Sequence, residues 1–328
     1  VLAFDVGTAS SGPQRHEITL TRLHLEEDAG KAQHCGDETV IDLNRAGVPL
    51  VEVVSEPELR SAEEAAAYLR ALRTLVRWLG VSHGNLEQGS LRCDANISLR
   101  RPGEDLGVRT ELKNLNSFRH VKRALEAEIR RQKEILDAGG RVLQQTRGWD
   151  AKRGATTLLR SKEEAEDYRY FDEPDLPPLR LPAETIAQAR GALPELPLER
   201  QERLFAEHCG IGLSHQLTRE LCREELLADT FEALVAQGVT PRRAATWLTT
   251  EILARLSDPR ELASAPLTLS ELAELLRLID RGRLTQAQGK ELLEQLWSGQ
   301  RDGLTVEEQA RASGLLDCAI DQAEIRAE

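Results

Sequence analysis

Residues 89–117 constrain the fold of this chain most strongly, because their hydrophobicity alternates with a period of two. From Leu91 to Arg100 every odd-numbered residue is apolar, counting the small Ala and Cys side chains that also fit an interior, and every even-numbered residue is polar. This period is typical of a β-strand with one buried face. A loop at 101–107 contains a Pro-Gly pair, and alternation resumes at 108–113. The two runs predict a β-hairpin.

The polar face of this hairpin carries an unusual set of side chains. A symmetrical loop would place Asp94 near Lys113 and Asn96 near Glu111. A solvated strand usually carries a mixture of Lys, Glu and Thr, whereas this one carries Asp, Asn, Ser, Arg and Lys, which bind metal ions and phosphate groups. These residues alone leave two interpretations open, an ordinary solvated face or a functional one.

The composition narrows the class of protein. The 328 residues include 40% hydrophobic and 30% charged side chains, which are the values of a globular protein. No apolar run approaches the ~20 residues that span a bilayer, so we expect no membrane partner. A net charge of −12 argues against broad coating of nucleic acid, although it allows one local basic patch.

The cysteine and methionine content predicts the cellular compartment of the protein and indicates that the chain is part of a longer one. The five cysteines are scattered, odd in number and form no C-x-x-C pair, so we expect a reducing, cytoplasmic setting. The chain contains no methionine, not even at position 1. We therefore expect Val1 to lie inside a longer protein.

The first half of the chain is predicted to alternate strands with helices. Strand patterns occur at 16–27 and within 40–55. Ser61 and Glu64 form a capping box for a helix that is expected to reach about residue 80. After the hairpin, an Asn or Ser caps a second long helix, which ends at a Gly-Gly pair.

The second half is predicted to be helical. No convincing strand follows residue 183, and short amphipathic helices succeed one another. The proline-rich stretch 172–182 is the expected linker, and a further boundary is expected near Asp258. The predicted fold class is α+β, with an antiparallel-sheet domain at 1–182, a helical domain at 183–257 and a helical tail at 258–328.

Acidic residues at a strand end are candidate metal ligands. The segment HLEEDAGK at 24–31 places three carboxylates in a row, which repel one another unless a cation or several donors compensate them. Mg²⁺ binds one or two such carboxylates together with substrate phosphates, and the alternative is a solvated acidic turn. Glu52 interrupts the apolar run VPLVEVVS. A buried carboxylate there needs a partner, either a shared metal ion or an Arg or Lys salt bridge.

Several common catalytic motifs are absent from the sequence. The Gly-Lys pair at 30–31 lacks the remainder of a phosphate-binding loop, and neither G-x-G-x-x-G nor G-x-S-x-G occurs. Cys93 falls on the apolar face and is interpreted as a core thiol. Trp149 and the aromatic residues at 168–171 are interpreted as interior packing rather than base stacking. The remaining acids, amides, Lys and Arg suit Mg²⁺-assisted phosphoryl transfer.

Five long strings carry a resemblance to a known family. In chain order they are LHLEEDAGK, IDLNRAGVPLVEVVSEPE, EQGSLRCDANISLR, RTELKNLNSFRHV and RSKEEAEDYRYFDEPDLPP. With this order and spacing, the chain closely resembles the B subunit (GatB) family of the aspartyl/glutamyl-tRNA amidotransferases. The resemblance is dense over 17–182 and continues loosely through the helical half, which is similar to the YqeY-like part of that family.

The resemblance implies a subunit of an ATP-dependent enzyme that acts on Asp-tRNA(Asn) or Glu-tRNA(Gln). The A subunit, an amidase, would release ammonia from glutamine, and a C subunit would complete the complex. The B subunit would use Mg²⁺ and ATP to phosphorylate the side-chain carboxylate of the tRNA-bound amino acid. Ammonia would then displace the phosphate, so the implied enzyme is a carbon–nitrogen ligase that is active only in the complex.

The resemblance also implies roles for particular residues. The implied Mg²⁺ ligands are Glu26 and Glu52. The implied catalytic residues are Asp94, Asn96 and Lys113. On the same segment, the expected nucleotide-binding residues are Arg92, Ser98 and Asn114. In these roles Lys113 would neutralise the phosphate oxygens during transfer, and Asp94 would hold or orient a metal ion.

The chain also departs from the family pattern. The family has an N-terminal G-L-E-V-H strand whose Glu and His help to build the same metal site, and its last helices extend further. We therefore expect a catalytic domain at 1–182 that is truncated at its start and a YqeY-like tail that is incomplete. Because the site is then incomplete, the alternative function is a non-catalytic scaffold that docks the tRNA and the amidase. A weaker alternative, an unrelated Mg²⁺-ATP ligase, would need a nucleotide-binding loop that the sequence lacks.

Overall fold

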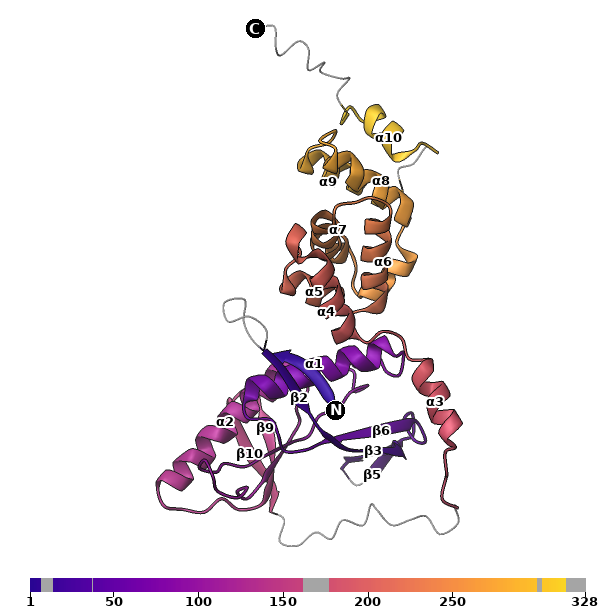
Figure 1. Ribbon diagram of the computed structural model, residues 1–328. Coiled ribbons are helices and arrows are strands. Elements are labelled where there is room, and N and C mark those ends of the chain that lie inside the picture. The colour runs from indigo at the N-terminus through magenta and orange to yellow at the C-terminus, as the bar shows by residue number, and fades with distance from the viewer. Residues whose placement is uncertain (7–13, 37, 162–176, 300–302, 317–328) are drawn as a thin grey trace. The chain divides into compact units, whose positions relative to one another are not determined.

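The computed structural model describes the chain except for residues 7–13, 37, 162–176, 300–302 and 317–328 (Figure 1). Contacts divide the chain into two compact units. Unit 1 comprises Val1–Arg73 and His83–Pro178, and unit 2 comprises Thr74–Ser82 and Leu179–Glu328. The expected linker at 172–182 begins outside the described residues, and the aromatic residues at 168–171 also lie outside them.

Unit 1 is built from small sheets. In chain order its strands are β1 (Leu2–Val6), β2 (Gln14–Ile18), β3 (Leu20–Glu27), β4 (Lys31–Cys35), β5 (Glu38–Asp42), β6 (Pro49–Ser55), β7 (Ala95–Ile97), β8 (Thr110–Lys113), β9 (Gln145–Asp150) and β10 (Ala155–Ser161). Three antiparallel ladders pair β1 with β2, β3 with β6, and β4 with β5. The fourth sheet has the order β10-β9-β8-β7, in which only the β8–β9 ladder is parallel. The predicted α+β class is confirmed, with this one parallel ladder added.

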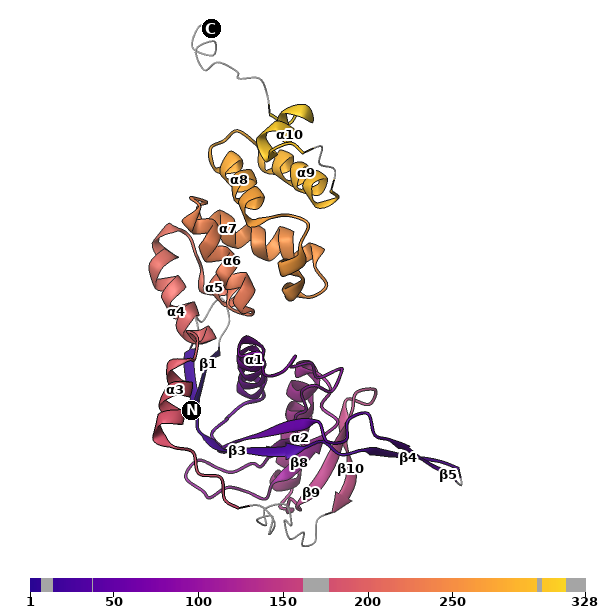
Figure 2. The ribbon, with the colours of Figure 1, turned by 90° about the vertical axis from the view of Figure 1, so that its right-hand side faces the viewer.

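The strands predicted at 16–27 and within 40–55 are present, the first divided into β2 and β3 and the second as β6, which covers the apolar run VPLVEVVS from Pro49 to Ser55. The first is divided at Thr19, whose backbone N–H donates to Glu58 Oε2 at 2.7 Å instead of joining a ladder. Within residues 40–55, the turn at 43–48 separates β5 from β6. The β4–β5 hairpin is exposed along both strands and extends away from the rest of unit 1 (Figure 2).

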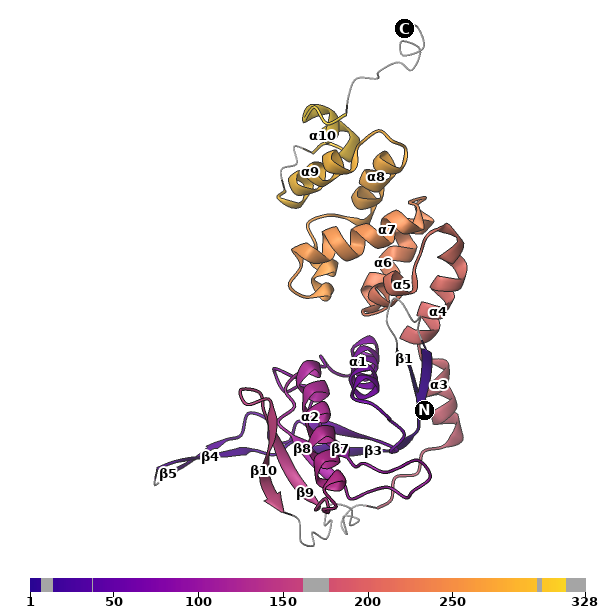
Figure 3. The ribbon, with the colours of Figure 1, turned by 90° about the vertical axis from the view of Figure 1, so that its left-hand side faces the viewer.

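Helix α2 (Phe118–Asp137) explains the parallel ladder, because it carries the chain from β8 back to the start of β9. Its start is the predicted one, since Ser117 Oγ accepts a hydrogen bond from His120 N at 3.1 Å. Gln132 Nε2 donates to Thr110 Oγ1 at 3.2 Å, so the helix covers one face of the four-stranded sheet (Figure 3). The other face of this sheet is the one that carries the polar side chains of the hairpin.

Helix α1 (Ala62–Trp78) also begins where the sequence predicts. Glu64 N donates to Ser61 Oγ at 3.1 Å, and Ser61 Oγ donates to Glu64 Oε1 at 3.0 Å. The capping box therefore satisfies two polar groups at the start of the helix. The helix contributes residues to both units, since its residues up to Arg73 belong to unit 1.

Unit 2 contains no strand among its described residues. Its helices are α3 (Ala183–Gly191), α4 (Pro197–His208), α5 (His215–Leu221), α6 (Glu225–Ala236), α7 (Pro241–Trp247), α8 (Leu269–Asp280), α9 (Gln286–Trp297) and α10 (Val306–Ala312). A π-helical turn, Leu248–Ile252, follows α7, and short 3₁₀ helices occur at Cys209–Ile211, Leu253–Arg255 and Pro259–Ser264. None of the helices in the described part of the chain is long and apolar enough to cross a membrane.

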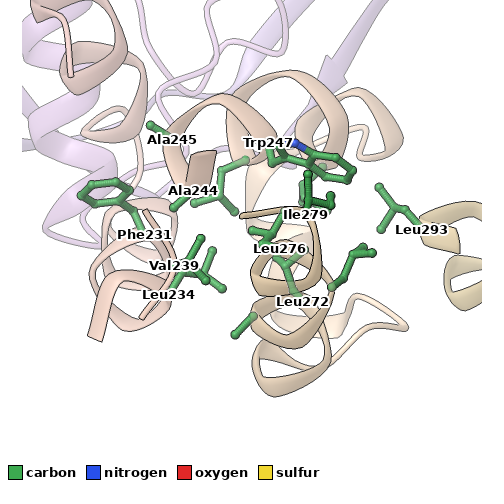
Figure 4. Close-up of a cluster of buried hydrophobic side chains, with 14 of the residues drawn as sticks. Phe231, Leu234, Val239, Ala244, Ala245, Trp247, Leu272, Leu276, Ile279 and Leu293 are labelled. Carbon is green, nitrogen blue, oxygen red and sulfur yellow. The ribbon is translucent and has the colours of Figure 1, made fainter. Parts of the chain in front are cut away.

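The core of unit 2 lies between its helices. Phe231, Trp247 and Leu276 are almost completely buried and belong to one apolar cluster (Figure 4). Three of the later helices begin with a threonine capping box, in which the threonine hydroxyl accepts from the backbone three residues ahead. The helices predicted beyond residue 183 are thus present, and α4 to α10 contribute apolar side chains to this cluster, whereas α3 has no buried residue.

Candidate active site

The hairpin predicted at 89–117 is present, with the register that a symmetrical loop gives. Asn96 lies opposite Glu111, and Lys113 Nζ lies 2.5 Å from Asp94 Oδ2. The paired strands are shorter than the alternating runs. The ladder ends at the pair Ile97 and Thr110, and beyond it Gly107 lies so close to Leu99 that a Cβ would be 2.3 Å from the Leu99 carbonyl oxygen.

A cavity of about 550 Å³, called the hollow below, lies beside the hairpin. Its lining residues are Leu86, Glu87, Gln88, Gly89, Leu91, Arg92, Cys93, Asp94, Lys113, Asn114, Leu115 and Asn116. Four of the predicted site residues therefore meet around one cavity. The lining does not include Asn96, which lies on the same strand face as Asp94, or Ser98, which follows β7. Their roles stay predictions.

Lys113 and Arg92 are the two cationic side chains that line the hollow, and Lys113 is the one that contacts Asp94. Its Nζ contacts Asp94 at 2.5 Å and Glu111 Oε1 at 3.2 Å. Burial lowers the pKa of Lys113, but the hydrogen bonds to Asp94 and Glu111 outweigh this effect and raise the pKa above its ordinary value of 10.5. Lys113 is therefore charged at neutral pH, and its ammonium group suits the binding of phosphate oxygens.

Asn114 follows β8 in a special backbone conformation. Its φ of 65° makes it the single non-glycine residue with a left-handed backbone in the described part of the chain. Asparagine tolerates this conformation better than most residues, and such strain is often found at functional sites. The neighbouring strand accommodates the side chain, because a Cβ on Gly148 would lie 3.0 Å from Asn114 Nδ2. No sequence pattern had indicated Gly148.

Arg92 lines the hollow and forms a salt bridge with the buried carboxylate of Asp28. Its Nη2 lies 3.1 Å from Asp28 Oδ2 and its Nη1 lies 3.4 Å from Asp28 Oδ1. Arg45 Nε binds the same carboxylate at 2.8 Å, and Ala29 N donates to it at 3.0 Å. Asp28, which is only 8% exposed, is thus compensated by two arginines and a backbone donor rather than by solvent. The sequence signalled that three adjacent acids need compensation, but it did not identify Asp28 or Arg45.

Glu26 and Glu52, the implied metal ligands, share one face of the β3–β6 ladder. Glu26 lies opposite Leu50 and Glu52 lies opposite His24, so the two glutamates are diagonal neighbours. The expectation that Glu52 is buried is wrong, because its side chain is 38% exposed on a ladder of only two strands. Arg22 Nη2 lies 3.5 Å from Glu52 Oε2, so the salt-bridge alternative is realised at least in part.

The two carboxylates on this face of the ladder suit a hard cation whose other ligands come from phosphates or water. Two carboxylates on one face are the number that Mg²⁺ binds when phosphates and water complete its coordination. Among the described residues there is no group of three or more His, Cys, Asp or Glu side chains arranged to hold a metal ion. A Mg²⁺ site at Glu26 and Glu52 therefore stays a prediction that depends on ligands from a substrate.

For Cys93 and Trp149, the structure agrees with the interpretation of each as a packing residue. Burial raises the pKa of the Cys93 thiol to about 12, so Cys93 is a neutral thiol in the wall of the hollow and not a nucleophile. Trp149 is partly buried in β9, and its ring centroid lies 6.4 Å from that of His120 in α2. It packs between helix and sheet.

Comparison with known proteins gives a consistent result. Residues 5–187 match the family model described as the GatB/GatE catalytic domain, and residues 229–327 match the one described as the GatB domain. The chain is 47% identical over 302 residues to the B subunit of the aspartyl/glutamyl-tRNA(Asn/Gln) amidotransferase of Solidesulfovibrio magneticus. Proteins of the same name from Trichormus variabilis and Thermodesulfovibrio yellowstonii are each 43% identical, over 307 and 316 residues. These alignments cover 91%, 91% and 95% of this chain but only 62%, 62% and 65% of the relatives.

Proposed function

The chain belongs to the GatB/GatE family, and on that premise we propose that it forms part of the B subunit of a tRNA amidotransferase. This enzyme is a carbon–nitrogen ligase of the cytoplasm that works as a complex with an amidase, the A subunit, and a C subunit. The chain spans about 62% of the length of the first two of these relatives. The activity of the whole subunit is therefore part of the proposal.

The proposed reaction has two steps. A carboxylate oxygen of the amino acid on Asp-tRNA(Asn) or Glu-tRNA(Gln) attacks the γ-phosphorus of ATP, and ADP leaves. Ammonia from the amidase then attacks the carbonyl carbon of the acyl phosphate, so that a C–N bond forms, phosphate leaves and the nitrogen loses a proton. Mg²⁺, when bound, would neutralise charge on the phosphates.

The observation that carries this proposal is the meeting of a cation, a carboxylate and an amide around one hollow. Lys113 would neutralise the oxygens of the phosphoryl group during transfer, where charge develops and positioning does most of the catalysis. Asp94 is 50% exposed and so is open to a ligand. It would orient the attacking group or a cation. Arg92 and Asn114, which also line the hollow, would contact the nucleotide.

Glu26 and Glu52 are the proposed ligands of Mg²⁺, through one or two carboxylate oxygens each. The salt bridge from Arg22 to Glu52 competes with this role. It favours the second candidate function, a non-catalytic scaffold that docks the tRNA and the amidase. The two candidates differ in whether the hollow takes part in chemistry.

The test uses the full-length subunit in the assembled complex with misacylated tRNA, ATP, Mg²⁺ and glutamine. Asp94→Asn and Lys113→Met remove one charge each from the hollow, and both are expected to lower the rate of amidation and of ADP formation about 100-fold or more. The matched controls are Asp105→Asn and Lys152→Met, because both residues are exposed and neither lines the hollow. We expect the controls to retain wild-type rates.

The two functions give opposite results in this assay. Wild-type rates for both Asp94→Asn and Lys113→Met would contradict the phosphoryl-transfer proposal. Under the scaffold alternative these variants keep amidation intact, because the reaction would then take place elsewhere. The binding of tRNA, measured separately by filter retention, shows whether a lost rate reflects chemistry or docking.

A further inference from the structure

Glu111 lies next to the hollow but does not line it. It occupies the middle of β8, two residues before Lys113, so both side chains emerge on the same face of the strand. One carboxylate oxygen, Oε1, lies 3.2 Å from Lys113 Nζ. The other, Oε2, accepts a hydrogen bond of 2.7 Å from Thr146 Oγ1. The Glu111 carboxylate therefore joins the Lys113 ammonium group to the next strand, β9.

Thr146 fixes this carboxylate in place. It lies directly opposite Glu111 in the parallel β8–β9 ladder and is only 1% exposed. Its hydroxyl donates to Glu111 and also accepts from Arg160 Nε at 3.4 Å, and Arg160 is the partner of Thr146 in β10. Three neighbouring strands thus hold the Glu111 side chain, which is 19% exposed.

Asp94, the second carboxylate that contacts Lys113, is exposed to the hollow and not held by neighbouring strands as Glu111 is. Asp94 precedes β7, lines the hollow and is 50% exposed, so a ligand in the hollow can engage it. If Asp94 were the only partner of Lys113, the long lysine side chain would follow Asp94 when a ligand draws it away. Glu111 keeps a fixed anion beside the ammonium group whether or not Asp94 is engaged.

We propose that Glu111 is a positioning residue that holds the Lys113 ammonium group at the wall of the hollow and thereby leaves Asp94 available to the substrate. This inference rests on the proposed phosphoryl-transfer function. It assigns the two carboxylates different tasks, because one is held by the sheet and the other is open to the hollow.

The experiment measures kcat and KM for ATP in the assembled complex with the full-length subunit. Glu111→Gln keeps the shape and an acceptor for Thr146 but removes the charge that holds Lys113. We expect kcat to fall about 10-fold while KM for ATP changes little, because the lost interaction acts on the transferring phosphoryl group. Thr146→Val is expected to lower kcat in the same direction, and Thr146→Ser, which keeps the hydroxyl, to restore it. Glu134→Gln on the exposed face of α2 is the matched control.

A double-mutant cycle separates positioning from a merely structural role. If Glu111 acts through Lys113, then Glu111→Gln has no further effect on kcat in a Lys113→Met background. An equal loss in both backgrounds, or a wild-type kcat for Glu111→Gln, would overturn the inference. If Lys113→Met itself retains full activity, the proposed function fails instead. The two failures are therefore distinguishable.

Discussion

Replacement of Glu128 by glutamine is expected to destabilise unit 1 and leave unit 2 unchanged. Glu128 lies in α2 and is fully buried. Its carboxylate accepts from Arg131 Nε at 2.9 Å and Nη2 at 2.5 Å, from Gln132 Nε2 at 3.0 Å and from Thr156 Oγ1 at 2.9 Å. Because Thr156 belongs to β10, this carboxylate links the helix to the sheet beneath it.

The expected magnitude follows from these contacts. Glutamine keeps one acceptor oxygen, but its NH₂ group replaces the other oxygen and faces donors of Arg131. A hydrogen bond to a charged group contributes about 1.5–3 kcal/mol, so the loss of one and the weakening of another corresponds to about 3 kcal/mol. Full burial of Glu128 means that solvent does not screen this effect. The estimate agrees with the cost of breaking a buried ion pair, about 3–5 kcal/mol.

Hydrogen exchange followed by mass spectrometry measures this effect for each unit of the full-length subunit. The opening free energies of amides in α2 and in β8–β10 are expected to fall, while those in α8 and α9 stay unchanged and serve as an internal reference. Glu134→Gln, on the exposed face of α2, is the matched control and should shift these values by less than about 0.5 kcal/mol. A similarly small shift for Glu128→Gln would refute the reasoning. It would mean that the cost of burying the carboxylate cancels the free energy that its hydrogen bonds contribute.

The same variant tests a pH dependence. Burial raises the pKa of Glu128, but the hydrogen bonds from Arg131, Gln132 and Thr156 outweigh it and hold the pKa below its ordinary value of 4.5. A carboxylate with a lowered folded-state pKa stabilises the fold fully above the unfolded-state pKa, and this contribution is lost as the pH falls through the folded-state pKa. The difference in stability between wild type and Glu128→Gln is therefore expected to be constant above pH 4.5 and to shrink below it.

Two further predictions concern unit 2, and thermal unfolding checks both. Arg77→Met is expected to lower the free energy of unfolding by about 3–5 kcal/mol. Arg77 is 4% exposed and lies 2.5 Å from the carboxylate of Glu224, which would be left buried and unpaired. An unchanged melting temperature would contradict this prediction. Gly289→Ala in α9 is expected to lower the free energy of unfolding by about 1–3 kcal/mol, because the new Cβ would lie 2.4 Å from Ile279 Cδ1. The control is Gly191→Ala in α3, where a Cβ meets no atom within 4 Å, so this substitution should be neutral or stabilising. Equal effects of the two glycine substitutions would show that helix propensity, not packing, decides them.

The elements that the sequence predicted correctly are those set by local patterns. The hairpin register follows from alternation and a symmetrical loop, and these two local features alone place Lys113 beside Asp94. The starts of α1 and α2 followed from caps, which depend on residues only three positions apart. The ends of the strands were less predictable, because a close approach such as that of Gly107 to Leu99 depends on three-dimensional packing.

The parts of the site that the sequence missed depend on contacts between distant residues. Asp28 and Arg92 are 64 positions apart, and no periodic pattern identifies which arginine binds which acid. The expected burial of Glu52 was wrong for a related reason. A strand with an apolar run is buried on both faces only where other elements cover both faces. Here β6 pairs with β3 alone, and the Glu52 side chain stays partly exposed. The left-handed backbone of Asn114 is permitted by its residue type, but no local sequence pattern predicts it.

If the hollow binds an anion as proposed, the contacts of Asp28 with both Arg45 and Arg92 would couple that binding to the turn before β6. An anion in the hollow that attracts Arg92 competes with Asp28 for the same guanidinium group. Asp28 would then keep Arg45, whose Nη2 donates to Gly89 O at 3.0 Å in the lining of the hollow. Linkage is reciprocal, so any change that tightens or loosens this turn alters the affinity for the anion by the same factor by which the anion alters the turn. Asp28, which does not line the hollow, would thereby influence the affinity of the hollow for an anion.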